Sequence, residues 1–189
     1  MSAQSLRASA QRLLSSWSAP DAPQDALRQT YLAFLDDTPD ACLRSSAIGH
    51  LTGSVVVFDA SLSYVLLTLH PRVGRWLQLG GHCEESDEAI RDVAVREGWE
   101  ESGIPDLRVT HAPVRLDTHP ITCSLGVPTH HLDVQFAAMA APTPDGRLPE
   151  VTLSDESTDL AWWPVDALPA DTGTDVPDLV IRGIEALAR

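Results

Sequence analysis

Three glutamates, Glu97, Glu100 and Glu101, are spaced at i, i+3 and i+4. In a helix this spacing places the three carboxylates on one face. Like charges at these spacings cost a helix a few tenths of a kcal/mol per pair, so the arrangement brings no stability. Mg²⁺ and Mn²⁺ prefer carboxylate and water oxygens, and Mg²⁺ commonly also binds substrate phosphates. The spacing therefore indicates a divalent-metal site, and a solvated acidic helix face is the alternative.

The surrounding residues indicate which elements hold these carboxylates. Apolar residues recur at helical spacing just before the glutamates, and they predict a helix over residues 87–102 that ends at Gly103. An apolar, strand-like run lies before the helix and is closed by Gly80 and Gly81. The predicted unit is a strand, a tight glycine turn, an acidic loop and then the helix with the carboxylates.

The stretch from Gly81 to Ile104 resembles the Nudix box, G-x5-E-x7-R-E-U-x-E-E-x-G-U, in which U is a bulky apolar residue. The positions that match the pattern are Gly81, Arg96, Glu97, Glu100, Glu101, Gly103 and Ile104. A match that spans a strand end, a loop and a helix is far more specific than a lone glycine motif.

The chain departs from the box at three points. Asp87 stands where the pattern has Glu, the run from Asp87 to Arg96 is one residue too long, and Gly98 replaces a bulky apolar residue. Taking Glu88 as the box acid restores the spacing but misplaces the glycine. We prefer Asp87, which we expect to cap the helix and to pair with Arg96. The Asp and the extra residue also occur together in a Nudix subgroup that resembles this chain from about His50 to Pro169.

The resemblance implies an α/β/α sandwich with a mixed β-sheet. It also implies Mg²⁺-dependent hydrolysis of a nucleoside diphosphate linked to a group X, a small-molecule substrate. The expected metal ligands are Glu97, Glu100, Glu101 and the carbonyl of Gly80. Members of the family often take a further acid from a loop before a late strand, and Glu156, with Asp155 second, is the candidate here for accepting the proton of the attacking water.

Two rival functions share the resemblance. One is a catalytically silent Nudix module that binds a nucleotide as a sensor, which would suit the shifted box and Gly98. The other is a prenyl diphosphate isomerase, which relies on a reactive cysteine; neither Cys83 nor Cys123 stands where that resemblance would place it. The complete carboxylate set favours the hydrolase.

Composition limits the classes of partner and the number of domains. A chain of 189 residues with a net charge of −14 is long enough for one well-buried domain, and its charge argues against binding polymeric nucleic acid. Three scattered cysteines predict no disulfide framework and favour a cytoplasmic protein. No apolar run is long enough to cross a membrane. We expect a helical extension over residues 1–47 and the catalytic domain over 48–189.

The rest of the chain gives the supporting elements. Two helices are expected within residues 5–17 and 27–35; they could pack on the domain, form a homodimer contact or wall the pocket. Strands are expected at 54–59, 64–69, 107–116, 131–136 and 160–164, with a loop at 117–128 and a closing helix at 178–188. Arg72 and Arg75, in the loop after the second strand, are candidates for binding substrate phosphates.

Four histidines raise the alternative of a zinc site. They are His82, His119, His130 and His131, and their spacing matches no compact set of zinc ligands. His131, Asp133 and Gln135 instead alternate with apolar residues, which predicts a strand whose polar face lines the pocket.

Overall fold

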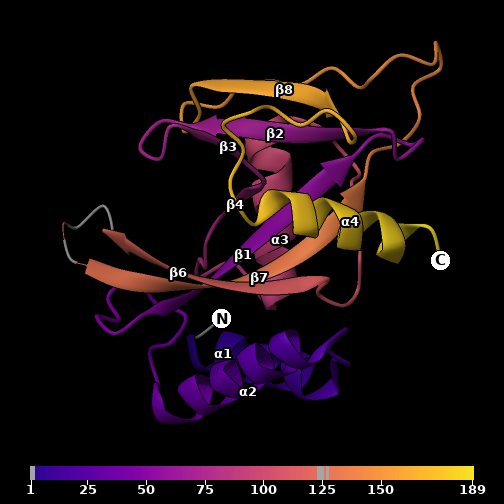
Figure 1. Ribbon diagram of the computed structural model, residues 1–189. Helices are drawn as coiled ribbons and strands as arrows, with labels where there is room; N and C mark the ends of the chain where they lie inside the picture. Colours follow the sequence, from indigo (N-terminus) through magenta and orange to yellow (C-terminus); the bar gives the residue numbers. More distant parts are fainter. Residues whose placement is uncertain (1–2, 123–125, 127) are drawn as a thin grey trace.

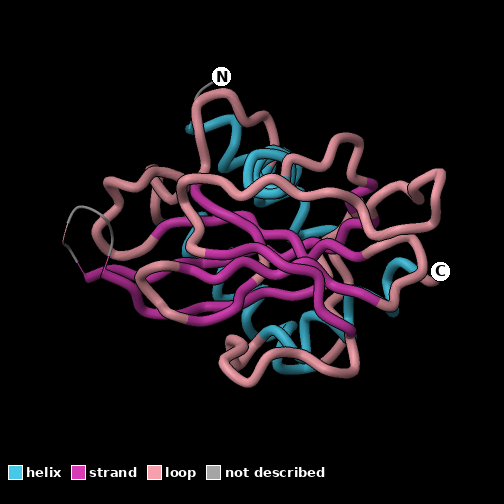
Figure 2. The backbone as a smooth tube through the Cα atoms, turned by 90° about the horizontal axis from the view of Figure 1, so that it is seen from above, coloured by secondary structure: helices cyan, strands magenta, loops and turns pink. Residues whose placement is uncertain are grey.

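The computed structural model describes residues 3–122, 126 and 128–189. Four helices and eight strands occur in this part of the chain (Figure 1). In chain order they are α1 (Ala3–Ser16), α2 (Ala22–Asp37), β1 (His50–Phe58), β2 (Tyr64–His70), β3 (Arg75–Leu77), β4 (Leu79–His82), α3 (Ile90–Ser102), β5 (Arg108–Val109), β6 (Arg115–Thr122), β7 (Pro128–Met139), β8 (Asp159–Pro164) and α4 (Val176–Leu187). Loops connect them at the edges of one curved layer of strands (Figure 2).

The described strands form one mixed sheet centred on β1. Strand β1 pairs in parallel with β7 and antiparallel with β2 and β4, and β6 pairs antiparallel with β7. Strand β8 joins the far side of β2. All nine residues of β1 are buried, which explains its run of three valines, because β-branched side chains pack well on a sheet that is covered on both faces.

Helices α3 and α4 cover opposite faces of β1, with α4 in front of the strand and α3 behind it in Figure 1. Val55 and Val57 belong to the core on the α3 side, whereas Val56 and Phe58 pack with residues of α4. Two hydrophobic layers therefore enclose the sheet, which is the predicted α/β/α sandwich.

The two N-terminal helices pack on this domain through buried side chains. Gln24 of α2 exchanges two hydrogen bonds with the backbone of Leu116 in β6, at 3.1 and 2.7 Å. The Tyr31 hydroxyl, also from α2, donates to the backbone carbonyls of Asp117 and Asp133. The packing alternative for these helices is confirmed, and the domain boundary between residues 47 and 48 stays a prediction.

Most of the expected strands and helices are present, but one region was predicted wrongly. Residues 107–116 contain only the short β5 and the start of β6, and β6 continues to Thr122 through residues predicted to be a loop. Pro120 sits inside β6 opposite His130 of β7. Among the described strands β6 pairs only with β7, and an edge strand tolerates a proline, which explains why the proline did not end it.

The start of α3 also differs from the prediction. The helix begins at Ile90 instead of residue 87, after Ala89 in an extended conformation. The Asp92 side chain accepts the Ala89 N–H at 2.8 Å, so Asp92, and not Asp87, satisfies the helix start. The helix ends at Gly103 in the left-handed conformation (φ 69°), as its C-terminal glycine predicts.

None of the helices in the described part of the chain combines the length and the apolar character that crossing a membrane requires.

Candidate active site

The three box glutamates occupy one side of α3, but they differ in burial. Glu97 and Glu101 are buried against β4, whereas the side chain of Glu100 is 45% exposed. Glu101 accepts a hydrogen bond from the Gly80 N–H at 3.0 Å. A Cβ atom at Gly81 would overlap the Glu97 carboxylate, so any larger residue would make that side chain move from its present position. Gly81 thus lets the backbone of β4 approach the acidic face of the helix, whereas Gly80 lets β4 approach Ser54 of β1.

Arg96 connects the loop, β4 and the helix. Its guanidinium donates to both carboxylate oxygens of Asp87, at 3.2 and 3.1 Å, and to the backbone carbonyl of His82 at 2.8 Å. It also donates to Glu97 at 2.9 Å and Glu100 at 3.1 Å. The structure therefore brings Asp87 and Arg96 together, and the same arginine touches two of the candidate metal ligands.

The competing assignment of Glu88 as the box acid finds no support in this geometry. Asp87 is buried and also accepts the Glu84 N–H at 2.8 Å, whereas Glu88 is exposed. The extra residue is accommodated in the loop before α3, since the helix starts only at Ile90.

Burial and the repulsion between neighbouring carboxylates disfavour the charged forms of Glu97 and Glu101. The pKa of Glu101 is raised to about 8, mainly by burial, while the hydrogen bond from the Gly80 N–H lowers it. The negative charges of Glu97, Glu156 and Glu100 add to the increase. Burial also raises the pKa of Glu97 to about 6, although Arg96 acts in the opposite direction. A divalent cation would relieve both effects, because it favours the charged carboxylates.

Glu156 reaches this cluster from the loop before β8. Its charge raises the pKa of both Glu97 and Glu101, which places it within electrostatic range of them. The loop is fixed to β2 by a hydrogen bond between the Thr68 and Ser157 hydroxyls and by the Thr158 N–H, which donates to the Leu69 carbonyl at 3.0 Å. Asp155, the second candidate, is exposed in the same turn.

The two arginine candidates lie on the exposed surface around β3. Arg75 donates to the backbone carbonyl of Thr172 at 3.4 Å, on the segment that leads to α4. The charges of Arg72 and Glu156 both act on His70, Arg72 lowering its pKa and Glu156 raising it, although burial has the largest effect. Arg72 therefore shares a neighbour with the acidic cluster, and a role for either arginine in binding phosphate stays a prediction.

Comparison with known proteins gives the family. The NUDIX domain model matches residues 50–182, which include every element from β1 into α4. This chain belongs to the Nudix family. Its box therefore lies at α3 and the loop before it, where the structure gathers the carboxylates.

Solved structures share the Nudix fold of this chain. A NUDIX-family hydrolase from Clostridium perfringens has a TM-score of 0.54 and 22% identity over 74% of this chain and 96% of its own. The Escherichia coli dihydroneopterin triphosphate pyrophosphohydrolase gives 0.55 and 18%, over 74% and 96%. A Caenorhabditis elegans Ap4A hydrolase gives 0.51 and 19%, over 73% and 97%. None of the curated proteins matches the chain.

Gly98 lies in a tight contact within this Nudix domain. A Cβ atom there would come within 3.0 Å of both Leu107 Cδ1 and Val55 Cγ1. The turn of α3 is thus closely packed, and the glycine replaces the bulky apolar residue because neighbouring side chains fill that space.

A second cluster of polar side chains was not predicted from the sequence. The spacing of His82, His119, His130 and His131 matches no compact set of zinc ligands, and His50 was not among the candidates. In the structure His50, His82 and His131 come from three strands and present ligand atoms within 4.8 Å of one another. Spacing along the chain was the wrong criterion, because neighbouring strands bring distant residues together.

Proposed function

We propose that this Nudix chain is a Mg²⁺-dependent (or Mn²⁺-dependent) pyrophosphohydrolase that cleaves the diphosphate linkage of a nucleoside diphosphate joined to a group X. The observation that carries the proposal is the buried pair Glu97 and Glu101, whose pKa values are raised to about 6 and about 8 with Glu156 nearby. Structural stability does not require such a cluster, because like charges held together repel one another.

The donor set fits a hard divalent cation. Glu97, Glu100 and Glu101 offer only carboxylate oxygens, which Mg²⁺ prefers to the nitrogen and sulfur ligands of softer metals. The structure shows Gly80 contacting Glu101 through its N–H, and the Gly80 carbonyl as a further ligand stays a prediction. A bound Mg²⁺ would neutralise phosphate charge and lower the pKa of a water molecule.

The other residues have separate tasks in this proposal. Arg96 and Asp87 fix the loop against α3, so that the carboxylates stay in place. Glu156, exposed at the edge of the cluster, accepts the proton of the attacking water. Arg72 and Arg75 bind phosphate oxygens of the substrate through their paired donors.

The substrate is a small molecule in this proposal. The structural neighbours named above include an Ap4A hydrolase and a dihydroneopterin triphosphate pyrophosphohydrolase. The substrates in these two names are small molecules that contain linked phosphates. Their low identity gives the fold, and the loops around the site decide the group X. Cys42 and Cys83 are free thiols, and we place the reaction in the reducing cytoplasm.

The sensor and isomerase functions are weaker alternatives. A sensor has no use for a cluster of acids that activates water, and Gly98 fits its packing instead of marking a damaged helix. Among the isomerase cysteines, the Cys83 thiol lies 3.5 Å from the Leu51 carbonyl, to which it donates, and Cys123 lies outside the described residues.

A substrate screen tests the proposal directly. Nucleotide sugars, dinucleoside polyphosphates, ADP-ribose and damaged nucleoside triphosphates are incubated with the protein and Mg²⁺ or Mn²⁺, and the phosphate-containing products are separated by chromatography. We expect turnover of at least one class, complete loss in excess chelator and recovery when the metal is returned. Hydrolysis that continues unchanged in chelator would remove the proposed mechanism, and tight nucleotide binding without any turnover would support the sensor.

A further inference from the structure

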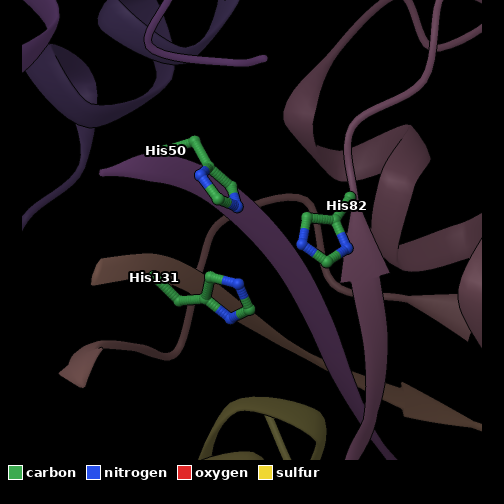
Figure 3. Close-up of side chains that lie close together, drawn as sticks. All are labelled: His50, His82 and His131. Atoms are coloured by element: carbon green, nitrogen blue, oxygen red, sulfur yellow. The ribbon is translucent and has the colours of Figure 1, made fainter. Parts of the chain in front are cut away.

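Three histidine rings converge on one face of the sheet (Figure 3). His50 begins β1, His82 ends β4 and His131 lies in β7. The register explains their meeting: His50 is the direct neighbour of His131, and Thr52, two residues after His50, is the neighbour of His82. Residues two apart in a strand share a face, so all three side chains point the same way.

The three rings lie close together, and several of their nitrogens have no hydrogen-bond partner among the described residues. Their centroids lie 5.1 Å apart for His50 and His82, 5.0 Å for His50 and His131, and 4.9 Å for His82 and His131. His50 is only 1% exposed, and neither of its ring nitrogens makes a hydrogen bond of normal geometry with a described residue, although the Ser46 carbonyl lies near the ring. Nε2 of His82 and Nε2 of His131 are also buried without a partner. Leaving a buried polar atom unpaired costs about 1–3 kcal/mol, so the arrangement calls for a ligand.

The rings are neutral at neutral pH, which suits a metal better than an anion. Burial, with the charges of the neighbouring histidines and Arg44, lowers the pKa of His131 to about 3. His82 is neutral by its geometry, because its Nδ1 faces the Arg44 guanidinium, which only donates. Burial also lowers the pKa of His50, against a smaller opposite effect of the Ser46 carbonyl. Neutral imidazoles offer lone pairs to a cation and bring no positive charge to a phosphate.

We propose that His50, His82 and His131 bind one late first-row divalent ion, of which Zn²⁺ matches the ligands best. Three imidazoles with an open fourth position form a common zinc arrangement, whereas Mg²⁺ prefers oxygen. Nitrogens around tetrahedral Zn²⁺ lie about 3.4 Å apart, so the present spacing has to close by at most about 1.4 Å. The site is distinct from the carboxylates, and the inference does not rest on the proposed hydrolase function.

Arg44 competes with the ion for His82. Its Nη2 atom lies 2.8 Å from His82 Nδ1, and because a guanidinium only donates, that nitrogen accepts. A metal on Nδ1 displaces Arg44 directly, and a metal on Nε2 requires the ring proton to move to Nδ1, which again breaks this contact. Arg44 is exposed and can swing into solvent. Its removal should therefore leave metal affinity unchanged or raise it.

His119 stands next to the cluster without belonging to it. Its ring is 5.4 Å from that of His131, but its Nδ1 is held by Asp117 at 3.0 Å. That hydrogen bond is the largest cause of a raised pKa at His119, so its ring favours the charged form more than the other three do. The proposed site therefore has three ligands from the protein, not four.

The test titrates the chelator-treated full chain with Co²⁺ and Zn²⁺ in excess Mg²⁺, which occupies the carboxylates. We expect one equivalent of Co²⁺ with the visible absorption of a four-coordinate site, displaced by Zn²⁺. His82→Gln and His131→Gln should each weaken binding by more than about 100-fold, beyond the 10–100-fold cost of losing a group that only supports a ligand. The matched control is His130→Gln, an exposed neighbour on the opposite side of β7, which should bind like the wild type.

Three further measurements make the result decisive. Circular dichroism confirms that each variant is folded, and histidine ring signals in NMR spectra of the wild type should show three rings perturbed by Zn²⁺. The melting temperature should rise with Zn²⁺ in the wild type and not in His82→Gln, because an ion that binds only the folded state stabilises it. Arg44→Ala should bind Co²⁺ at least as tightly as the wild type.

The proposal is overturned if the wild type binds neither ion, or if binding persists in both histidine variants. Binding that disappears in Glu101→Gln and survives in the histidine variants would place the ion on the carboxylates. Inorganic phosphate that binds the wild type and is lost in Arg44→Ala, with no Zn²⁺ binding, would assign the cluster to an anion.

Discussion

Of the two buried glutamates of the cluster, Glu101 is the one whose charge the folded protein tolerates less without a cation, since burial and its acidic neighbours raise its pKa to about 8, against about 6 for Glu97. Glu101→Gln keeps an oxygen that can accept the Gly80 N–H and removes the charge. We expect the hydrolysis rate to fall by two or more orders of magnitude, as for other losses of a key electrostatic group. Stability without metal should stay level or rise, because repulsion with Glu97 is relieved.

Steady-state kinetics on the substrate found in the screen, with thermal melting in chelator, measures both effects. Glu88→Gln is the matched control, because it removes the same charge from an exposed position one residue from Asp87. A wild-type rate in Glu101→Gln would show that the carboxylate face has no catalytic role.

Arg96 differs from Glu101 because its removal should damage the fold as well as the rate. Its guanidinium is 15% exposed and Asp87 is 4% exposed, so Arg96→Ala leaves a buried carboxylate with only the Glu84 N–H. Breaking a buried pair from one side costs about 3–5 kcal/mol. Urea denaturation should show a loss of this size, together with a lower rate.

Arg147→Ala serves as the comparison for Arg96→Ala. Arg147 also pairs with an aspartate, Asp145, but its side chain is 85% exposed, so its loss should cost less than about 1 kcal/mol. Unchanged stability of Arg96→Ala with loss of activity would instead place Arg96 on the substrate.

At the scale of the elements, α3 shows how packing overrides a family pattern. The box calls for a bulky residue where Gly98 lies, yet Leu107 and Val55 already fill that space. Gly98→Leu should lower the free energy of unfolding by about 1–3 kcal/mol through overpacking. Gly98→Ala should be close to neutral, because about 1 kcal/mol gained in helix propensity offsets tight contacts with the new methyl group. Denaturant titration of both variants separates the effect of side-chain size from that of helix propensity. If Gly98→Leu were more stable than the wild type, the space around Gly98 would not be filled as proposed.

Elements whose signal lies within a few neighbouring residues were predicted correctly from the sequence. A strand that depends on pairing with a distant segment was not. The apolar spacing around α3 and the valine run of β1 each predict their own element, because the signal lies within a few residues. The second half of β6 was missed because its pairing with β7 is not visible in its own sequence. Pro120 favours a loop on the sequence alone, although an edge strand can contain a proline.

The candidate sites follow the same rule. The spacing of Glu97, Glu100 and Glu101 on one helix is readable from the sequence, and so is a partner acid for Arg96. The meeting of His50, His82 and His131 depends on the register of three strands, which the sequence does not state. Strand parity alone could have shown that each histidine shares a face with the polar residues two positions away.

At the scale of the whole molecule, the N-terminal helices are part of the folded unit. Gln24 is 5% exposed and satisfies both the N–H and the carbonyl of Leu116, and Asp21, just before α2, pairs with Arg182 of α4 at 2.7 Å. These contacts tie α2 to the sheet at β6 and to α4 on the same domain. The α1 and α2 segment thus belongs to the hydrophobic core that also covers β1.

This linkage predicts that a change in α2 is felt by the entire domain. Gln24→Ala leaves the Leu116 N–H and carbonyl unpaired, and each buried unsatisfied group costs about 1–3 kcal/mol, so the loss should be about 2–6 kcal/mol. Gln11→Ala, which removes only an exposed hydrogen bond to Asp36, should change stability by less than about 0.5 kcal/mol. A Trp17→Phe background leaves Trp76, Trp99, Trp162 and Trp163 as the fluorescent residues, none of which lies in α1 or α2. If the helices are integral, far-UV circular dichroism and tryptophan fluorescence should shift together when Gln24→Ala is made in this background. Separate transitions would mean that α1 and α2 unfold on their own, and the catalytic domain would then stand without them.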